Sequence, residues 1–298
     1  MLHYVELPER GVLAVSGPDT RTFLQGLVSN DVLRAGPETA LYAALLTAQG
    51  RYLHDFFVVT IGEMLFLDCE AARRDDLMKR LKMYRLRSKV VLEDATDKFA
   101  AHALPGEAAA AAVGLPGTPG AARPVGGGAV YVDPRHAGMG VRALLPRDSA
   151  AATLASFGSS AGERGALERL RLTLGLPDGS RDLVVEKSIL LENGFDELNG
   201  VDWKKGCYVG QELTARTKYR GLVKKRLLPV RIEGPAPEPG ATITLGDQEA
   251  GEMRSAANGI GLAVMRLELL DKQAVEGGAF VAGGARLTPL KPDWVKLA

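Results

Sequence analysis

The order of hydrophobic and polar residues along the first hundred positions predicts alternating strands and helices. Apolar runs typical of strands occur at residues 11–15, 40–47, 51–60 and 64–68. Apolar residues recur with helical spacing over residues 19–28 and 70–84, so each segment is expected to form a helix with one apolar face. This β-α-β-β-α order is typical of an α+β sheet with helices on one face.

The middle of the chain has a different composition. Residues 101–128 are rich in Ala, Gly and Pro, so we expect a surface loop or a poorly ordered insertion there. Strands are expected to follow at residues 129–135 and 138–146, and helices at residues 149–156 and 163–174.

After Lys225 the pattern becomes one of short strands. Apolar residues alternate with other residues over 228–232, and glycines separate the apolar runs that follow. This pattern is typical of a small β-barrel. We therefore expect a domain boundary near residue 224, with one region over residues 1–223 and a C-terminal β-barrel over residues 224–298.

Composition and charge describe an ordinary soluble protein. The 298 residues suffice for about two domains, each with its own core. Hydrophobic residues make up 46% of the chain and charged residues 24%. The formal net charge is +1, so no global field draws the chain to nucleic acid or to an acidic membrane.

No segment predicts a membrane span or a secreted protein. Residues 1–17 lack the apolar core of a signal peptide, and the longest apolar stretch, residues 56–67, is interrupted and too short to cross a bilayer. The two cysteines, Cys69 and Cys207, form no C-x-x-C motif, which argues against a disulfide framework. We expect a cytoplasmic location and no contact with a membrane.

Cys207 is the strongest candidate for chemistry. It follows Lys204, Lys205 and Gly206, and the sequence GQELTART after it is expected to begin a helix. Ammonium groups and the amino end of a helix both lower the pKa of a thiol, and the thiolate is the nucleophile and the metal ligand. The alternative is that Cys207 is a small buried hydrophobic residue. Cys69, at the end of an apolar strand, is expected to be structural.

The segment around Cys207 is also basic. Residues 204–226 contain eight Lys and Arg residues and one acid, Glu212. They could form a solvated face, or a site for a polycarboxylate or phosphate that arginine recognises. Direct binding of nucleic acid is not expected, because Tyr208 and Tyr219 are the segment's only aromatic residues.

The sequence predicts no metal site that the chain could build alone. There is no phosphate-binding loop motif, no H-E-x-x-H, and no spacing of the four histidines typical of metal ligands. An iron–sulfur cluster usually takes four thiolates, and this chain has two cysteines. Any cluster would have to be shared with a partner or a second subunit.

The sequence KGCYVGQE, residues 205–212, resembles the signature of the YgfZ family, which is related in fold to the glycine-cleavage T-protein, an aminomethyltransferase. The segments VSGPDTRTFLQGLVSNDV, LLTAQGRYLHDFFV and GIGLAVMRLE resemble other parts of the family. The resemblance covers about residues 5–290, apart from the Ala/Gly/Pro segment.

The resemblance implies a folate-binding α+β fold: two ferredoxin-like halves around a central opening, the second at about residues 96–165, and a C-terminal barrel. It implies an accessory protein that binds tetrahydrofolate and serves the assembly or repair of iron–sulfur enzymes, including those that thiolate transfer RNA. Its partners would be assembly proteins or client enzymes. The alternative is a folate-dependent one-carbon enzyme, an aminomethyltransferase or demethylase.

The resemblance also implies a set of ligand residues. Glu192 matches the position where relatives carry an acid or amide after a proline, although Leu190 replaces the usual proline here. A carboxylate can accept the paired N–H groups of a pterin, so Glu192 is expected to recognise the pterin. Arg216 and neighbouring lysines are expected to hold the anionic glutamate tail.

Two further groups of residues match family positions. Asn30 and Asp31 are expected to face the central opening, although helix-end and turn chemistry explains them equally well. Lys205, Tyr208 and Gln211 lie in the signature itself and are expected to line the folate site beside Cys207.

Overall fold

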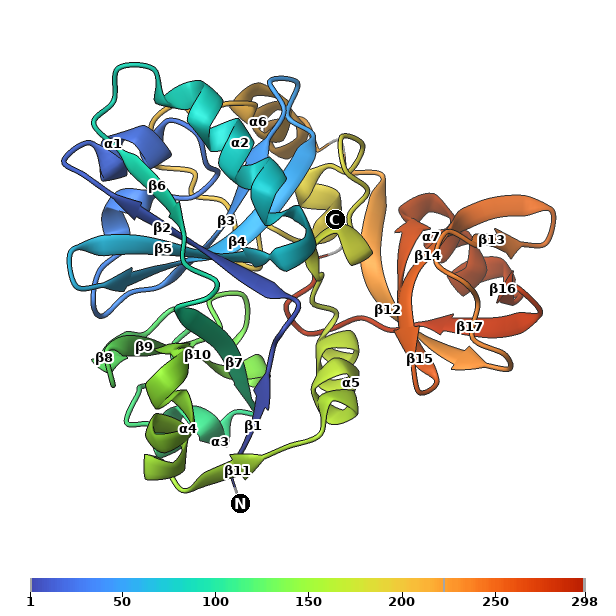
Figure 1. Ribbon diagram of the computed structural model, residues 1–298. Helices are drawn as coiled ribbons and strands as arrows, with labels where there is room; N and C mark the ends of the chain where they lie inside the picture. The colour runs from blue at the N-terminus through green and yellow to red at the C-terminus, as the bar shows by residue number, and fades with distance from the viewer. Residues whose placement is uncertain (1, 222, 297–298) are drawn as a thin grey trace. The chain divides into compact units, whose positions relative to one another are not determined.

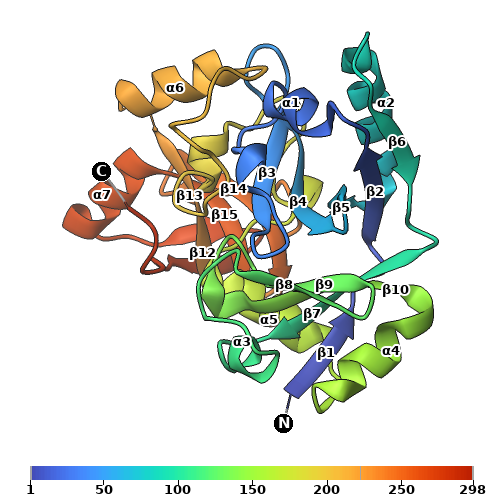
Figure 2. The ribbon, with the colours of Figure 1, turned by 90° about the vertical axis from the view of Figure 1, so that its left-hand side faces the viewer.

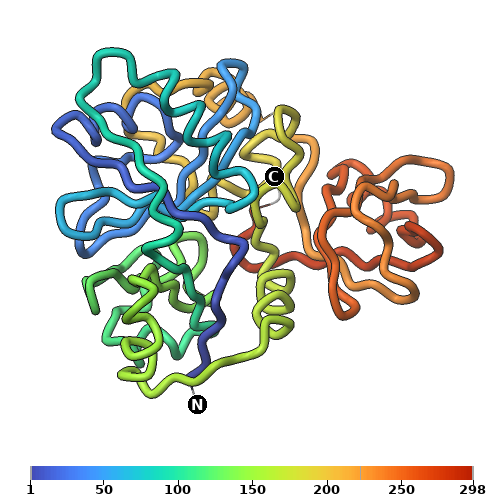
Figure 3. The backbone as a smooth tube through the Cα atoms, viewed as in Figure 1, coloured from blue at the N-terminus to red at the C-terminus, as the bar shows by residue number. Residues whose placement is uncertain are grey.

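The computed structural model describes residues 2–221 and 223–296, and the chain divides into two compact units. The first unit comprises Met1–Ala48, Leu53–Arg164 and Leu198–Gln211, and the second comprises Gln49–Tyr52, Gly165–Glu197 and Glu212–Ala298. The chain therefore passes between the units several times. Figure 3 traces the path of the backbone.

The first unit contains a five-stranded sheet in the order β3-β4-β5-β2-β6 (Figure 1). The pairs β4–β5, β2–β5 and β2–β6 are antiparallel. Its strands are β2 (Arg10–Ser16), β3 (Leu41–Leu46), β4 (Tyr52–Ile61), β5 (Met64–Glu70) and β6 (Val91–Asp94). Nearly all residues of β2, β3 and β4 are buried, so the apolar runs of the sequence form the core here.

Helical segments accompany this sheet: α1 (Thr20–Gln25), η1 (Val32–Arg34), η2 (Ala71–Arg73) and α2 (Arg74–Arg85). Leu77 and Leu81, one helical turn apart on α2, are fully buried. The helical spacing in the sequence therefore predicted Leu77 and Leu81 on the packed face of α2 correctly, whereas Tyr84, which the same spacing places on that face, is 40% exposed.

The first unit also contains a six-stranded sheet in the order β11-β1-β7-β10-β9-β8, which Figure 2 shows from another side. Its strands are β1 (Leu2–Glu6), β7 (Phe99–Pro105), β8 (Ala122–Val125), β9 (Gly128–Val132), β10 (Gly140–Pro146) and β11 (Ser159–Ala161). Only the β1–β11 pair is parallel among the pairs between described strands of this sheet. The accompanying helices are α3 (Ala108–Ala112), η3 (Ala137–Met139) and α4 (Arg147–Ser156).

The expectation of a loop or disordered insertion over residues 101–128 is wrong. These residues form most of β7, all of α3 and all of β8. Ala109, Ala110 and Val113 belong to the hydrophobic core of this part of the unit. Alanine has the highest helix propensity, and its small side chain lets a helix pack closely. The alanine-rich composition of residues 101–128 therefore indicates a closely packed helix and not a disordered segment.

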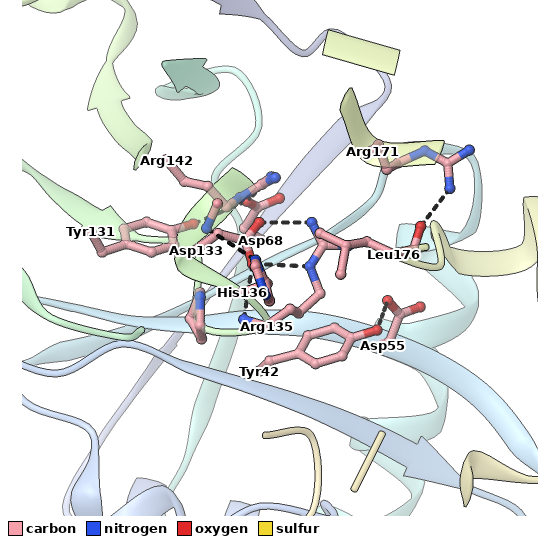
Figure 4. A network of polar contacts seen from close by, with 12 residues as sticks. Tyr42, Asp55, Asp68, Tyr131, Asp133, Arg135, His136, Arg142, Arg171 and Leu176 are labelled. Atoms are coloured by element: carbon pink, nitrogen blue, oxygen red, sulfur yellow. Dashed lines mark hydrogen bonds and ion pairs between the residues drawn. The ribbon is translucent and has the colours of Figure 1, made fainter. Parts of the chain in front are cut away.

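A buried network of charged side chains connects the two sheets of the first unit (Figure 4). The carboxylate of Asp68 on β5 accepts hydrogen bonds from Arg10 at 2.6 Å and from Arg142 on β10 at 2.8 Å. The hydroxyl of Tyr131 on β9 donates to the same carboxylate at 3.2 Å. Burial alone would raise the pKa of Asp68, but Arg10 and Arg142 outweigh burial and lower it.

Further members of the network surround the ring of Phe57. The guanidinium carbons of Arg10, Arg135 and Arg142 lie 5.5, 5.0 and 4.1 Å from the ring centroid, within cation–π range. Arg135 also donates two hydrogen bonds to Asp133, at 3.0 and 2.7 Å. These contacts distribute the charge of three buried arginines over carboxylates and an aromatic face.

The second unit contains a closed six-stranded barrel in the order β12-β15-β14-β13-β16-β17. Its strands are β12 (Lys225–Glu233), β13 (Thr242–Leu245), β14 (Gln248–Ala257), β15 (Ile260–Arg266), β16 (Phe280–Ala282) and β17 (Ala285–Pro289). Alternate residues Leu228, Val230 and Ile232 belong to one core with residues from the other strands. The sequence did not predict helix α7 (Leu267–Glu276), which follows β15.

Other segments complete the second unit: α5 (Arg164–Leu174), η4 (Gly179–Arg181), η5 (Leu190–Asn193) and α6 (Gln211–Tyr219). Arg171 on α5 is buried and donates to Asp182 at 2.6 Å, to Leu176 O at 2.7 Å (Figure 4) and to Ser255 on β14 at 2.7 Å. This cluster ties the barrel to the segments that precede it.

The predicted α+β class with a C-terminal barrel is confirmed by the two sheets and the closed barrel. In the part of the chain that the structure describes, no helix combines the length and the apolar character needed to span a membrane.

Candidate functional site

The segment that carries Cys207 is held against the turn that follows α1, within the first unit. Asn30 Nδ2 donates to the carbonyl oxygens of Tyr42 and Asn199, both at 2.7 Å. Ser29 Oγ donates to the carbonyl oxygen of Gly200 at 2.6 Å. These bonds fix the start of the segment before it reaches Cys207.

Lys205 fixes the middle of the segment from inside. Its ammonium nitrogen donates to the carbonyl oxygens of Gln25, Val28 and Asn30 at 2.8, 2.5 and 2.8 Å. Carbonyls at the end of a helix lack partners within the helix, so a cation there stabilises them. The side chain is buried and lies 4.9 Å from the ring centroid of Tyr208. Burial lowers the pKa of Lys205 to about 8, and the carboxylates of Asp31 and Asp202 oppose that shift.

Asp202 forms the turn that leads to Cys207. Its Oδ1 accepts hydrogen bonds from the backbone N–H groups of Lys204 at 2.7 Å and Lys205 at 2.9 Å, and its Oδ2 pairs with Arg34 at 3.1 Å. Burial alone would raise the pKa of Asp202, but these hydrogen bonds and Arg34 lower it. Beyond the cysteine, the N–H of Val209 donates to Gly26 O at 3.1 Å, so the segment is held on both sides.

The thiol of Cys207 is exposed at this fixed position. The alternative that Cys207 is a buried hydrophobic residue is therefore wrong. Cys69 has the opposite environment: it is 1% exposed, its Sγ donates to Gly11 O at 3.5 Å, and burial raises its pKa to about 12. Of the two cysteines, only Cys207 offers a sulfur that a partner could reach.

The structure places Asn30 and Asp31 in this scaffold. The side-chain oxygen of Asn30 accepts from the N–H of Asp31 at 2.8 Å, so its amide is bonded through both atoms. Asp31 Oδ1 accepts from Gln25 Nε2 at 2.8 Å and from the N–H of Leu33 at 3.1 Å. This is the turn chemistry given as the alternative for both residues. Their contact with a ligand stays a prediction.

Lys205 contacts the end of α1, Tyr208 lies against the ammonium of Lys205, and Gln211 is the first residue of α6. An ammonium has three N–H donors, and Lys205 uses all three on backbone carbonyls, which leaves none for a bound anion in this conformation. Tyr208 is buried, and Gln211 is half-buried at the first position of α6.

Glu192 and Arg216 belong to the second unit. Glu192 lies half-buried in η5, and among the described residues nothing donates a hydrogen bond to its carboxylate. Burial raises the pKa of Glu192, which Lys225 and Arg51 partly oppose. Leu190, which replaces the usual proline, is fully buried at the start of η5. Arg216 is exposed on α6.

Sequence reasoning missed Ser29 and Asp202, which hold the cysteine segment. The signal for Asp202 was present: an Asp directly before a turn often accepts hydrogen bonds from N–H groups two residues further on. Ser29 gave no such signal, because its partner Gly200 lies 171 positions away. Among the residues that the structure describes, no three His, Cys, Asp or Glu side chains gather as a group that could hold a metal ion.

Comparisons with known proteins agree with this architecture. Residues 5–114 match the model of the GCVT N-terminal domain, and residues 224–297 match the CAF17 C-terminal β-barrel domain. The crystal structure of the glycine cleavage system aminomethyltransferase T from Bartonella henselae superposes with a TM-score of 0.76, covering 99% of this chain and 86% of that chain. Sequence identity there is 17%, so this likeness shows the fold alone.

Several similar curated proteins share one name, iron–sulfur cluster assembly factor IBA57, mitochondrial. The mouse protein is 34% identical over 97% of this chain and 84% of its own length, and the human protein is 35% identical with the same coverage. The Aspergillus fumigatus homolog is 31% identical over 92% of this chain and 72% of its own length. These relatives are named mitochondrial, which contradicts the expected cytoplasmic location.

Proposed function

The chain belongs to the family of the iron–sulfur cluster assembly factor IBA57, and on that premise we propose that Cys207 donates a thiolate ligand to a cluster shared with a partner. The resemblance to the YgfZ family drawn from the sequence is correct at the broader level, and the relatives specify IBA57 within it. The cluster is the cargo of this reaction and not a resident cofactor.

The exposed thiol on a fixed segment supports this proposal. Iron binds the thiolate form of cysteine, so a ligand sulfur must be reachable from outside. Cys207 meets this condition, whereas Cys69 is buried and its pKa is raised to about 12. A cluster usually has four protein ligands, so the partner would supply the others. The hydrogen bonds around Lys205 and Asp202 hold the sulfur in place, which lowers the entropy lost on binding.

The two cysteines provide a matched test in cells that lack the native gene. We expect Cys207→Ala to fold normally and to fail to restore the activity of iron–sulfur enzymes. Cys69→Ala removes the other thiol and should restore that activity in full. Thermal unfolding of both purified variants checks that each is folded. Full rescue by Cys207→Ala would remove the thiol from the mechanism.

We propose further that the second unit binds tetrahydrofolate through Glu192. The carboxylate of Glu192 is half-buried and accepts no hydrogen bond from the residues that the structure describes, so both of its oxygens are available to the two adjacent N–H groups of a pterin. Arg216 is exposed and free to hold the anionic tail of the ligand. Lys205 and Asn30 use their donors within the first unit, so we assign them to the scaffold of Cys207.

Calorimetric titration of the purified chain with tetrahydrofolate tests this part separately. We expect Glu192→Gln to weaken binding about tenfold or more, because one N–H group of the pterin would then face an amide N–H₂. Glu249→Gln, on the barrel, is the control and should bind like the wild type. Equal affinity in all three proteins would contradict the assignment of Glu192 and leave the role of Cys207 untouched.

We propose that the clients of the protein include iron–sulfur enzymes that thiolate transfer RNA. The support is the resemblance of KGCYVGQE to the YgfZ signature. Mass spectrometry of nucleosides from transfer RNA should show thiolated nucleosides lost in cells without the gene and restored by the wild-type chain. Normal levels in cells without the gene would exclude these clients.

One-carbon transfer is the second candidate function. The pKa of Glu192 is raised by burial, and a carboxyl group with a raised pKa suits general acid–base catalysis. This candidate predicts turnover of tetrahydrofolate with an aminomethyl donor, lost in Glu192→Gln and retained in Cys207→Ala. Absence of turnover in the wild type would exclude it.

A further inference from the structure

The end of helix α2 exposes an unusual run of side chains. Residues 82–87 are all exposed, and three of them are apolar: Met83, Tyr84 and Leu86, with exposed fractions of 59%, 40% and 88%. Single exposed apolar residues are normal, but three within six positions concentrate exposed apolar surface on one short segment, as is found at interaction sites. We call residues 79–89, which comprise the end of α2 and the start of the connection to β6, the α2 turn surface; Figure 2 shows the backbone of this connection.

The backbone of this turn is fixed in a strained conformation. Leu86 has φ 42° and ψ −110°, a conformation that residues other than glycine rarely adopt. The turn is held by hydrogen bonds from Ser88 N to Arg85 O at 2.7 Å and from Lys89 N to the carboxylate of Asp19 at 2.7 Å. The side chain of Leu86 is thus presented to solvent from a rigid position.

Cations surround the apolar side chains. Five of them form no ion pair with any residue that the structure describes: Lys79, Lys82, Arg85, Arg87 and Lys89. The acids at the other end of α2 are already engaged, since Asp75 pairs with Arg74 and Asp76 with Arg80. A chain of net charge +1 therefore concentrates unpaired positive charge around an exposed leucine.

We propose that the α2 turn surface docks a partner protein whose surface presents carboxylates around an apolar recess. Leu86 fills the recess, and the surrounding Lys and Arg side chains contact the carboxylates. Leu86 is the most exposed of the three apolar residues and its backbone is held by the hydrogen bonds of the turn, which suits a recess of matching shape, whereas lipid has no fixed shape to match. Tyr84 is the one aromatic residue of this surface, whereas proteins that bind single-stranded nucleic acid stack several bases on successive aromatic side chains, so the surface favours a protein over nucleic acid. This proposal does not depend on the role of Cys207 or Glu192.

Site-specific photocrosslinking identifies the partner in cells. A photoreactive amino acid replaces Leu86 in the full chain, and a matched control replaces Val275 on α7, which is 86% exposed and precedes an acid, Glu276. A protein captured at position 86 and not at position 275 is then purified. Its binding to the wild-type chain is measured by calorimetry at about 50 mM and about 300 mM salt.

We expect Leu86→Asp, and separately the pair Arg85→Glu with Arg87→Glu, to weaken this binding more than about tenfold, and Val275→Asp to leave it unchanged. Higher salt should weaken binding of the wild type. The variants alter exposed side chains, and thermal unfolding confirms that each is folded. Failure to capture any protein specifically at position 86 would overturn the proposal, as would a captured protein that binds Leu86→Asp as tightly as the wild type.

Two further measurements distinguish other occupants. The chain is sedimented with vesicles of phosphatidylcholine containing about 30% phosphatidylglycerol, and is titrated with total transfer RNA. We expect neither to bind through this surface. Vesicle binding that Leu86→Asp abolishes would overturn the proposal in favour of a membrane, and RNA binding that the double charge reversal abolishes would overturn it in favour of RNA.

Discussion

The ammonium nitrogen of Lys205 lies 2.5 Å from the carbonyl oxygen of Val28, just beyond the end of helix α1. The two residues are 177 positions apart in the chain, yet this contact fixes the segment that exposes Cys207. Lys205 stands two positions before the cysteine, so the lysine serves the thiol by positioning its backbone. Its neighbour Lys204 is exposed, which gives a matched pair for experiment.

Lys205→Met should destabilise the protein and loosen the cysteine segment. The change leaves the buried carbonyls of Val28 and Asn30 and the partly buried carbonyl of Gln25 without this donor, at a cost of about 3 kcal/mol in the free energy of unfolding. Urea unfolding measures that cost, and hydrogen exchange should quicken over residues 198–211. Lys204→Met is the control and should change neither quantity. If the two variants had the same free energy of unfolding, the three hydrogen bonds of Lys205 would contribute little to stability.

The two thiols should differ sharply in reactivity toward a thiol reagent. Cys207 is exposed, whereas Cys69 is 1% exposed and has a pKa raised to about 12, so it stays protonated and shielded. We expect one thiol per chain to react in the native protein and both to react after denaturation. Cys207→Ser should abolish the native reaction. Native labelling of Cys69, located by peptide mapping, would contradict the buried position.

The first sheet could be predicted from the sequence because its strands are apolar runs, and apolar runs of that length form buried strands. The barrel could be predicted because alternation over residues 228–232 matches the two-residue period of a strand. Residues 101–128 were predicted wrongly because composition was given more weight than the helix propensity of alanine. Helix α7 was missed within a region dominated by strand patterns.

The site could be predicted only in part. The motif identified Cys207, but its exposure depends on tertiary contacts, and both environments were open from the sequence. The basic residues beside it suggested anion binding, whereas Lys205 proves to be bonded to carbonyls 175 or more positions away. No local pattern encodes such long-range partners. Whether Arg216 and Glu192 meet a ligand stays a prediction.

Asp68→Asn should strongly destabilise the first unit. The carboxylate is fully buried between Arg10 and Arg142, so removing its charge leaves two buried cations without this counter-charge. Breaking such a pair costs about 3–5 kcal/mol. Urea unfolding measures the loss. Tyr131→Phe removes one hydrogen bond to that carboxylate, at 3.2 Å, but keeps both ion pairs, and should cost less, about 1.5–2 kcal/mol. A similar cost for both changes would refute the electrostatic explanation.

The free energy of unfolding should fall as the pH decreases from the ordinary pKa of histidine to the lowered pKa of His54. Burial, together with the charge of Arg73, lowers the pKa of His54 to about 4, and a hydrogen bond to Asp76 at 2.8 Å only partly opposes this shift. Between the ordinary pKa of about 6.5 and the lowered value, the unfolded chain takes up a proton that the folded chain does not. The free energy of unfolding should therefore drop by up to about 3 kcal/mol as pH falls through this window.

Urea unfolding at several pH values tests this, with His54→Gln as the variant that cannot titrate. The variant should be less stable near neutral pH because it loses packing, but its stability should depend less on pH between about 6.5 and 4. His3 is exposed, so His3→Gln is the control and should retain the wild-type slope. Parallel slopes in wild type and His54→Gln would assign the acid sensitivity to other groups.

As the pH falls, the affinity for tetrahydrofolate should begin to decrease at a higher pH than it would if Glu192 had the pKa of an ordinary glutamate. The ionised carboxylate accepts two N–H groups of the pterin, whereas the protonated carboxyl carries a hydrogen that opposes one of them. Because burial raises the pKa of Glu192, the carboxylate is lost at a higher pH than in a solvent-exposed glutamate. Affinity should therefore fall as pH decreases through the raised pKa.

Anaerobic calorimetry between about pH 5 and pH 8 measures the affinity for tetrahydrofolate. Glu192→Gln should bind weakly, and its affinity should not change with pH. A wild-type profile as flat as that of Glu192→Gln would mean that another group recognises the ligand.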